Sequence, residues 1–503
     1  MKAHLLYSQQ DFNFVGELPL NHEDLSQDLE LSTLFESMAQ GDKFLLEVAR
    51  RVVLTSLGEP EAIIYRQHIL ADCIDFPEMT REIYAIAVKS ITERRGLWGH
   101  KSSRFPSSIL SSAVQELEMF VGLLKQLRSL ADSFAEKVHS EGLRSLFRSL
   151  QVDLDDDYFA AIDNHLKQLR FKDGVLMSAE LYKDNSGINY ALCSPWESKV
   201  RWKERIGIGP RTVYTFTVPP RDEAGANALS DLSSRGINIV ANAAAQSADH
   251  IESYFSLLRA ELGFYVGCLN LRDQLEAKGE PTCFPIPVTS NQPHLTFSDL
   301  RDVSLALRAE NPIIGNDVHA RGKMLVIITG ANSGGKSTFL RSVGMAQLMM
   351  QCGMFVAAES YRAGVSNGIF THFIREEDAS MRSGRLDEEL SRMSTITDLI
   401  RSNSLMLFNE SFAATNEREG SEIARQIVRA LIHAEVRVFF VTHQFDFAES
   451  FLDEQQSDFV LFLRAERDAN GRRNFKLVER DPLSTSYGED IYKKVFLEFS
   501  NPN

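Results

Sequence analysis

The chain has 503 residues, of which 44% are hydrophobic and 24% charged, and this composition predicts a globular protein with two to four domains. Its net charge of −15 excludes a protein that coats nucleic acid through bulk positive charge, although a local basic patch is compatible with it. The five scattered cysteines argue against a disulfide framework or a zinc site, and no stretch reaches the roughly 18 apolar residues of a membrane span, so we expect a soluble cytoplasmic protein.

Apolar residues recur at helical spacing through the first 170 residues. Residues 28–150 predict several helices, separated by turns at proline and glycine. The clearest helix follows Pro106. Its apolar residues are three or four positions apart: Leu110, Val114, Leu117, Val121, Leu124, Leu127, Ala131 and Phe134. Such a stripe is typical of the core of a helical bundle, and a shorter helix is predicted at 155–170.

The pattern beyond residue 170 favours strands. Residues 175–182 and 188–193 flank a turn-forming loop and predict a β-hairpin, and residues 213–218 predict a third strand. We therefore expect a small β insert at about residues 174–218. The basic segment 199–205 is compatible with nucleic-acid contact, although a solvated loop is the simpler interpretation.

A long helical region is predicted from Asp222 to Lys278. As one helix it would be about 85 Å long at 1.5 Å per residue, unless its glycines break or kink it. A proline-rich linker at 281–293 then indicates a domain boundary. We expect a mainly helical domain at residues 1–285 and a second domain at residues 286–503.

The second domain alternates strands with helices, and residues 325–351 are its most informative segment. Residues 325–328 predict a buried strand, a glycine-rich loop follows, and a helix begins at Lys336. This is the P-loop pattern in its strand–loop–helix context, which binds the phosphates of ATP or GTP through backbone N–H groups, a lysine and a Mg²⁺-ligating hydroxyl, here Ser337. The predicted nucleotide-binding residues are Gly330, Ala331, Asn332, Ser333, Gly334, Gly335, Lys336, Ser337 and Thr338.

Two later strands end in side chains suited to phosphate chemistry. Strand 405–408 ends in Asn409 and Glu410, and strand 436–441 leads to His443. In a P-loop NTPase of this order, residue 409 belongs to the Mg²⁺ shell, Glu410 orients and deprotonates water, and His443 contacts the γ-phosphate. Each residue alone has a structural explanation, but their order after the P-loop favours catalysis. We expect an α/β P-loop domain with a largely parallel sheet.

Several short motifs of the chain occur in the order of one known family. They are residues 329–338, Asn409-Glu410-Ser411 with residues 415–420, Thr442-His443 and Ser486-Tyr487-Gly488. Across residues 295–490 the sequence resembles the ATPase domain of the MutS family, and residues 28–280 are similar to its core and lever region. The resemblance implies an ABC-type ATPase that uses ATP and Mg²⁺, dimerises so that each subunit completes its partner's site, and binds mismatched, damaged or branched DNA.

The resemblance also implies a signature loop that acts across the dimer interface. Within the matching stretch, Ser383 and Gly384 would offer a hydroxyl and a backbone N–H to the γ-phosphate, and Arg385 a positive charge. A flexible charged loop without a ligand is the alternative. Residues 414–420 match the loop that couples the two sites, and residues 312–317, which precede the P-loop strand, are predicted to contact the adenine base.

The chain also departs from the family pattern. Asn409 stands where the family has an aspartate and contributes no charge, which predicts weaker Mg²⁺ binding and slower turnover. The sequence leaves no room for a separate mismatch-recognition domain, so we expect a short form. We predict a MutS-like ATPase that acts on DNA as a homodimer or with a related subunit. The alternative is an ATP-gated protein-interaction switch, whereas a transporter ATPase is disfavoured because Leu-Ser-Gly-Gly-Gln is absent.

Overall fold

Helices fill most of the first half of the chain, and most strands lie in the second half. The computed structural model describes residues 2–97, 105–172, 174–184, 187–193, 215–289, 293–331, 333–375, 384–452, 458–467 and 473–483. Its α-helices are α1 (His22–Asp28), α2 (Leu31–Ala39), α3 (Lys43–Leu54), α4 (Pro60–Asp75), α5 (Pro77–Leu97), α6 (Pro106–Phe134), α7 (Glu141–Asp153), α8 (Asp156–Leu169), α10 (Glu223–Ala277), α11 (Val303–Arg308), α12 (Lys336–Gln351), α13 (Arg385–Leu399), α14 (Glu417–His433) and α15 (Phe445–Glu449). Its strands are β1 (Met177–Leu181), β2 (Gly187–Leu192), β3 (Ile286–Val288), β4 (Leu295–Leu300), β5 (Asn316–His319), β6 (Leu325–Gly330), β7 (Ser360–Gly364), β8 (Ile369–Phe373), β9 (Leu405–Asn409), β10 (Arg437–Val441), β11 (Val460–Arg467) and β12 (Arg473–Glu479).

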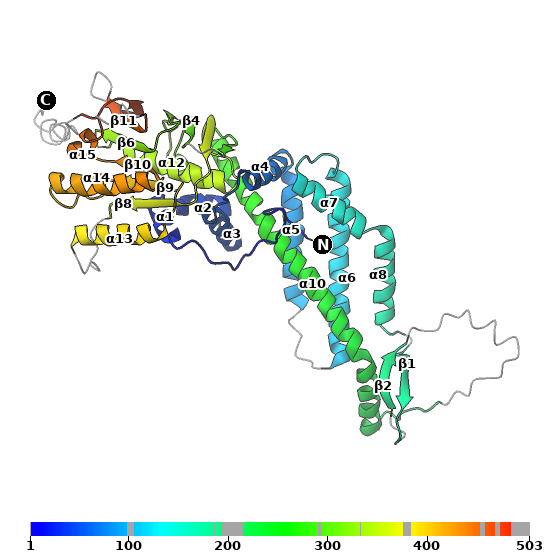
Figure 1. Ribbon diagram of the computed structural model, residues 1–503. Helices are drawn as coiled ribbons and strands as arrows, with labels where there is room; N and C mark the ends of the chain where they lie inside the picture. The colour runs from blue at the N-terminus through cyan, green and yellow to red at the C-terminus, as the bar shows by residue number, and fades with distance from the viewer. Residues whose placement is uncertain are drawn as a thin grey trace, which may run out of the picture. The chain divides into compact units, whose positions relative to one another are not determined.

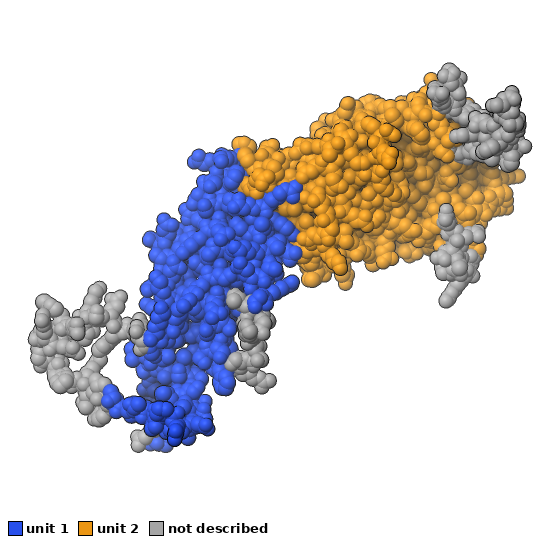
Figure 2. Space-filling view, turned by 180° about the vertical axis from the view of Figure 1, so that it is seen from behind, with its two compact units in different colours: residues 1–3, 81–138, 144–259 blue, residues 4–80, 139–143, 260–503 orange. Residues whose placement is uncertain are grey.

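The chain forms two compact units, which Figure 2 shows in blue and orange. Unit 1 contains residues 1–3, 81–138 and 144–259, and unit 2 contains residues 4–80, 139–143 and 260–503. Residues 4–80 therefore group with the strand-rich half of the chain. The domain boundary between residues 285 and 286 stays a prediction, and the compact units divide the chain at other positions.

Unit 1 is held together by apolar and charged contacts between helices. The predicted stripe of α6 is buried at Leu110, Val114 and Leu124, and the ring of Phe120 stacks on Phe255 of α10 at 5.8 Å between centroids. The buried Arg94 pairs with Glu116 at 2.9 Å, and it also contacts Asp249 and Glu252 of α10. A bundle core was the prediction for α6, and its burial confirms that interpretation.

The predicted hairpin is present, but the described part of the predicted third strand is not a strand. Strands β1 and β2 pair antiparallel, as the turn-forming loop predicted. Residues 215–218 have no strand structure, so this part of the prediction was wrong. They lead into Pro219 and Pro220, and proline cannot donate a ladder hydrogen bond. Residues 213–214 and the basic segment 199–205 lie outside the described residues.

Helix α10 is continuous over its 55 residues, despite the glycines that were expected to break or kink it. Two of these glycines lie where other helices approach closely. A Cβ at Gly263 would be 3.3 Å from the side chain of Leu45, and one at Gly267 would be 3.2 Å from that of Met38. The glycines therefore serve helix packing. Within the described part of the chain, no helix is both long enough and apolar enough to cross a membrane.

A six-stranded sheet forms the centre of unit 2, with strand order β12-β11-β6-β10-β9-β8 (Figure 1). Neighbours from β11 to β8 pair parallel, and β12 joins the edge antiparallel. Val441 is in register with both Ile328 of β6 and Asn409 of β9. Because these strands are parallel, their carboxyl ends meet at one edge of the sheet. The expectation of a largely parallel sheet is therefore met.

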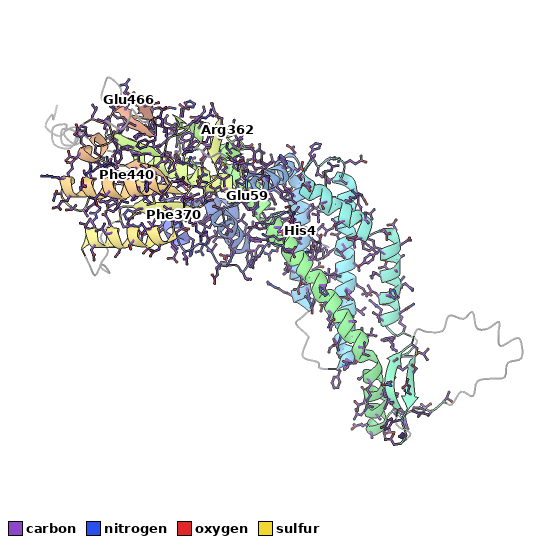
Figure 3. All side chains as sticks on the ribbon, in the orientation of Figure 1. His4, Glu59, Arg362, Phe370, Phe440 and Glu466 are labelled. Carbon is purple, nitrogen blue, oxygen red and sulfur yellow. The ribbon has the colours of Figure 1, made fainter. Side chains whose placement is uncertain are left out.

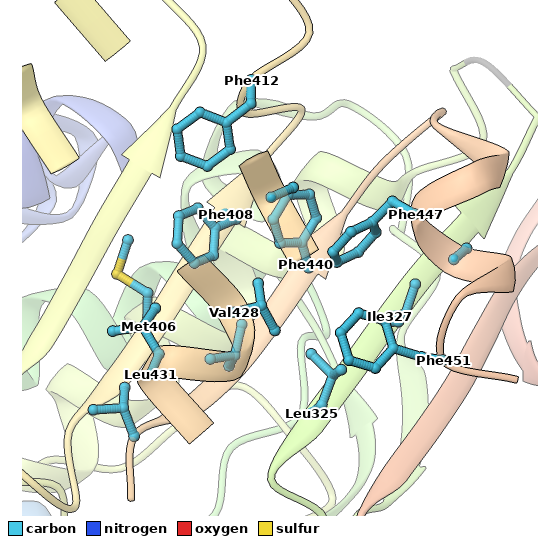
Figure 4. Packing of buried hydrophobic residues seen from close by; sticks show 14 of the residues in the cluster. Leu325, Ile327, Met406, Phe408, Phe412, Val428, Leu431, Phe440, Phe447 and Phe451 are labelled. Carbon is cyan, nitrogen blue, oxygen red and sulfur yellow. The ribbon is translucent and has the colours of Figure 1, made fainter. Parts of the chain in front are cut away.

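The two faces of this sheet pack against different helices. Alternate strand residues point to opposite faces, so Leu325, Ile327, Met406, Phe408 and Phe440 join one core with α13, α14 and α15 (Figure 4). In that core Phe440 stacks on Phe408 at 4.9 Å and lies 4.5 Å from Phe447. Leu407 points the other way and packs against Gly344 of α12. The stacked rings fix β9 and β10 just before their carboxyl ends.

A smaller sheet with strand order β3-β7-β4-β5 lies beside the larger one. Strand β3 falls inside the proline-rich segment that was predicted to be a linker, and it pairs parallel with β7. This segment is therefore part of unit 2. Asn316 of β5 joins the two sheets, because its Oδ1 accepts a hydrogen bond from the N–H of Leu477 at 2.8 Å and its Nδ2 donates to the carbonyl oxygen of Phe475 at 3.3 Å.

The backbone of the amino-terminal segment of unit 2 forms hydrogen bonds with buried side chains. The Glu261 carboxylate of α10 accepts hydrogen bonds from the backbone N–H groups of Leu5 and, at 3.2 Å, Phe12. The Tyr265 hydroxyl donates to the carbonyl oxygen of Leu5, and Arg66 Nε donates to that of Leu6 at 2.7 Å. These contacts hold Leu5, Leu6 and Phe12 in the core of unit 2, whereas residues 8–11 between them are exposed.

Glu261 makes the stability of unit 2 depend on pH. Burial raises the pKa of this carboxyl from 4.5 to about 7, against the opposing effect of the backbone N–H groups of Leu5, Phe12 and Leu6. Because the folded pKa is the higher one, the unfolding free energy should be greatest below about pH 4.5 and fall by roughly 3 kcal/mol as pH rises through 7. Urea unfolding should show that the unfolding free energy differs less between pH 5 and pH 8 in Glu261→Gln than in the wild type. If this difference is the same in both proteins, a group other than Glu261 causes the pH dependence.

Candidate functional site

Glycines shape the segment between β6 and α12. Gly330 and Gly335 adopt left-handed backbone conformations, with φ of +107° and +88°. A Cβ at Gly330 would lie 2.8 Å from backbone atoms of Ala465 on β11, and one at Gly334 would lie 2.8 Å from the carbonyl oxygen of Ala331. Larger residues would collide with this backbone. The segment can therefore curl tightly against β11 only with glycine at these positions.

Lys336 is the first residue of α12, and its side chain turns back over the glycine-rich segment. Its Nζ donates hydrogen bonds to the carbonyl oxygens of Gly330 and Ala331, both at 3.0 Å. The residue is 5% exposed, and burial lowers the pKa of its amine to about 8, although the carboxylate of Glu410 opposes this shift. Because the described hydrogen bonds of this buried amine go to neutral carbonyl groups, it is well placed to bind an anion.

Ser337 and Asn409 bring two neutral oxygen atoms together. The Ser337 hydroxyl donates to Oδ1 of Asn409 at 2.9 Å, which links the first turn of α12 to the carboxyl end of β9. Hard cations such as Mg²⁺ prefer oxygen ligands and usually keep waters or substrate oxygens as well. The pair fits that chemistry, but it supplies no charge. Among the described residues, no group of three His, Cys, Asp or Glu side chains forms a metal site.

Glu410 and His443 form a hydrogen-bonded pair beside these oxygens. The distance from His443 Nε2 to Glu410 Oε1 is 2.7 Å, and both side chains are partly exposed. The hydrogen bond from His443 and the charge of Lys336 hold the pKa of the Glu410 carboxyl below its usual range. Glu410 also has φ of +56°, and its N–H donates to the carbonyl oxygen of Val441 at 2.9 Å. The carboxylate is therefore ionised at neutral pH and fixed at the sheet edge.

Buried polar groups support the backbone around Glu410. The Ser411 hydroxyl lies 2.7 Å from Nδ1 of His372 on β8 and donates to the carbonyl oxygen of His372 at 2.6 Å. Glu389 of α13 accepts the backbone N–H of Phe412. Burial lowers the pKa of His372 to about 4, so its imidazole is neutral at pH 7. The sequence analysis did not predict this support, because its members are 17 to 39 residues apart.

Lys336, Ser337, Glu410 and His443 line a cavity of about 740 Å³, whereas Gly330, Ala331 and Asn409 are not among the residues of its described wall. Its polar wall contains residues 333–338, Glu410 and His443, and its other wall is largely apolar. The apolar wall contains Leu300, Leu305, Pro312, Ile313, Ile314, Phe339 and Phe475. Four of the six residues predicted to contact a base therefore lie in the cavity wall, namely Pro312, Ile313, Ile314 and Asn316. Phe475 was missed, although a single aromatic residue within a polar run, Arg473-Asn474-Phe475-Lys476, is a usable signal in the sequence.

The structure leaves part of the predicted site undescribed. Asn332, Ser383 and the segment 486–488 lie outside the described residues. Gly384 is the N-cap of α13, and Arg385 begins that helix with its Nε 3.8 Å from Oε1 of Glu389. Neither residue belongs to the described wall of the cavity. A role for them in a second subunit's site stays a prediction.

Two family models match the chain. Residues 58–278 match the MutS2 N-terminal domain, and residues 326–498 match MutS domain V. The chain belongs to the MutS family. The domain V match begins inside β6 and extends beyond β12, so the glycine-rich segment, Glu410 and His443 all lie within MutS domain V.

Curated MutS relatives match different shares of the chain. An endonuclease MutS2 from Streptococcus pyogenes is 23% identical over 474 residues, which cover 87% of this chain and 56% of the relative. A DNA mismatch repair protein MutS from Porphyromonas gingivalis is 34% identical over 192 residues, covering 37% of this chain and 21% of the relative. The human MutS protein homolog 4 is 31% identical over 137 residues, which cover 27% of this chain and 15% of the relative. The chain thus spans about half the length of the MutS2 relative and less of the others.

Proposed function

We propose that this chain is an ATPase that binds ATP and Mg²⁺ in the 740 Å³ cavity. The observation that carries the proposal is the placement of two hydrogen-bonded pairs, Ser337–Asn409 and Glu410–His443, at one sheet edge beside Lys336. Two oxygen ligands, a carboxylate and an ammonium in one place are the groups that phosphoryl transfer to water requires. The match of residues 326–498 to MutS domain V supports the same function.

In this proposal the phosphates of ATP lie against residues 333–338. The amino terminus of α12 offers backbone N–H groups and the positive end of the helix dipole. Lys336 adds a full positive charge when phosphate oxygens replace the carbonyl groups of Gly330 and Ala331 as its partners. The apolar wall around Ile314 and Phe475 then takes the base, which agrees with the prediction for residues 312–317.

Glu410 orients the attacking water and accepts its proton. Its low pKa makes it a weak base, so positioning the water is the larger part of its role. His443 fixes one carboxylate oxygen of Glu410 and, from the cavity wall, contacts the γ-phosphate. Mg²⁺, when bound, neutralises phosphate charge, and Ser337 and Asn409 hold it.

The proposal also includes a second subunit and DNA. Ser383, Gly384 and Arg385 of one subunit complete the γ-phosphate site of the other. A Cβ at Gly384 would meet none of the described residues within 4 Å, which supports an approach of another chain to the backbone there. DNA is the proposed partner because matched relatives are named DNA mismatch repair protein MutS and endonuclease MutS2. Mismatched, damaged or branched DNA is the expected form.

Asn409 favours a second candidate function, an ATP-gated protein-interaction switch with slow or no hydrolysis. An amide places no negative charge beside Mg²⁺, so nucleotide and metal can bind while turnover stays low. In that case ATP would control the shape of the protein, and its partner would be another protein. The two candidates share ATP binding and differ in turnover and in their response to DNA.

We expect Asn409→Asp to lower the Mg²⁺ concentration for half-maximal ATP hydrolysis by about tenfold, because a carboxylate binds the cation through charge. The measurement is phosphate release against Mg²⁺, with and without branched duplex DNA at two salt concentrations. Asn242→Asp on the exposed surface of α10 is the charge-matched control. Wild-type turnover that DNA changes supports the ATPase linked to DNA. ATP binding with turnover only in Asn409→Asp supports the switch, and no ATP binding rejects both.

A further inference from the structure

A second cavity, of about 710 Å³, lies at the opposite edge of the six-stranded sheet. Its wall includes residues that precede or begin the parallel strands: Met324 before β6, Asn367 before β8, Ser404 before β9, and Arg437 at the start of β10. The ends of β3 and β7 and the residue before β4, His294, also belong to the wall. The candidate ATP site lies where β6, β9 and β10 end, so the two cavities are separated by the length of these strands.

Arg437 is buried in this wall, and among the residues that the structure describes no acidic side chain pairs with it. The residue is 6% exposed, and its Nη1 donates to the carbonyl oxygen of His294 at 3.0 Å. Its Nε is shielded from solvent and has no hydrogen-bond partner in the described chain. A guanidinium carries five N–H donors and cannot lose its charge, and the one acceptor described here, the His294 carbonyl oxygen, is neutral. An anion at this position would therefore supply the missing acceptor and the missing opposite charge.

The surroundings of Arg437 add positive charge. Nε2 of His294 is also buried without a partner among the described residues. Burial and the charges of Arg362, Arg321 and Arg437 lower the pKa of His294, which shows that these arginines act on the same imidazole. Arg362 lies on β7 at the exposed surface of unit 2 (Figure 3). In a chain with net charge −15, this is a local concentration of cationic groups.

The acidic residues of the cavity wall do not neutralise Arg437. Glu59 and Glu435 are both exposed, and within the described chain neither forms an ion pair with the guanidinium. Besides His294, the described wall contains no aromatic ring on which a nucleotide base could stack. Its polar groups include the side chains of Thr289, Ser366 and Asn403. These features suit a compact oxyanion and not a base or an apolar ligand.

We propose that this cavity binds a compact phosphate-type oxyanion through Arg437 and His294. The planar guanidinium fork matches the oxygen spacing of a phosphate group, and its free Nε edge supplies the donors. The imidazole of His294 gains a proton when the anion arrives, and Arg362 contributes attraction at longer range. The site does not depend on the ATPase proposed above, because no residue of the two cavities is shared.

Titration calorimetry with inorganic phosphate and with pyrophosphate tests this proposal. Both ions can also enter the candidate ATP site, so the titrations use Lys336→Met, which removes the ammonium of that site. We expect binding to persist in Lys336→Met and to weaken at least tenfold when Arg437→Gln is added. Arg148→Gln, on the exposed surface of α7, should leave it unchanged.

Arg437→Gln could also disturb folding, so two further variants keep the test decisive. Arg362 is exposed, and Arg362→Gln should weaken phosphate binding about threefold to tenfold through lost Coulomb attraction alone. His294→Gln should remove the proton uptake that accompanies binding, measured by calorimetry in buffers of different ionisation enthalpy. Binding that is lost in Lys336→Met alone, or that is unchanged in both Arg362→Gln and His294→Gln, would overturn the proposal.

Discussion

Replacing Glu410 with glutamine should lower the rate of ATP hydrolysis by about 10²- to 10⁴-fold while ATP still binds. Glutamine keeps the size of the side chain and can still accept the hydrogen bond from His443, which is 2.7 Å long in the wild type. It cannot accept a proton from water. Removal of a negative charge beside the phosphates should leave the affinity for ATP equal or higher. Nucleotide binding by calorimetry and single-turnover hydrolysis separate the two effects.

The Glu410→Gln result needs a background in which turnover is measurable. The substitution should therefore be made in the wild type and in Asn409→Asp. Glu36→Gln on the exposed surface of α2 is a control that removes the same charge away from the cavity. If Glu410→Gln hydrolysed ATP at the undiminished rate in both backgrounds, another group would have to orient and deprotonate the water, and the assignment of Glu410 would be wrong.

Replacing Arg66 with alanine should destabilise unit 2 by about 3 kcal/mol or more. Arg66 is completely buried, and its guanidinium binds the carbonyl oxygens of Leu6 and Cys352 at 2.7 and 3.3 Å. It also lies over the ring of Tyr7 at 4.6 Å. The variant would leave two buried carbonyl groups without partners and an empty space between the amino-terminal segment and α12. Urea unfolding followed by circular dichroism measures this change in the unfolding free energy.

Two comparisons make the Arg66 result specific. Arg148→Ala removes an arginine from the exposed surface of α7 and should change stability by less than about 0.5 kcal/mol. Arg66→Lys keeps the charge and one donor nitrogen, so its stability should lie between those of the wild type and Arg66→Ala. An Arg66→Ala protein as stable as the wild type would mean that residues 5–12 contribute little to unit 2.

Local patterns in the sequence predicted several elements closely. The helix expected at residues 336–351 has the bounds of α12, because the glycine-rich segment fixes its start and the apolar periodicity its length. Strand β9 lies where a short apolar run predicted a buried strand, and the hairpin of β1 and β2 lies on either side of the predicted turn. The order of Lys336, Glu410 and His443 along the chain predicted that they share one edge of the sheet, since parallel strands bring their carboxyl ends together.

Long-range pairing was not predictable from these patterns. The sequence shows that Ser411 is polar and that His372 follows apolar residues, but not that β8 and β9 are neighbours and bring the two together. Phe475 reaches the cavity only because β12 returns along β11. The proline-rich segment 281–293 was interpreted as a linker, since prolines disfavour central strands, yet β3 pairs at the edge of its sheet.

The contact between Leu5 and Glu261 has a consequence for synthesis of the protein on the ribosome. The two residues are 256 positions apart. At roughly 5–20 residues per second, Leu5 is made about 13–50 s before Glu261 exists. Through that interval Leu5 and Phe12 lack the Glu261 carboxylate that accepts their backbone N–H groups in the folded protein. The apolar side chains of Leu5, Leu6 and Phe12 therefore stay incompletely packed for much of translation, and chaperones that bind short apolar segments have a natural target there.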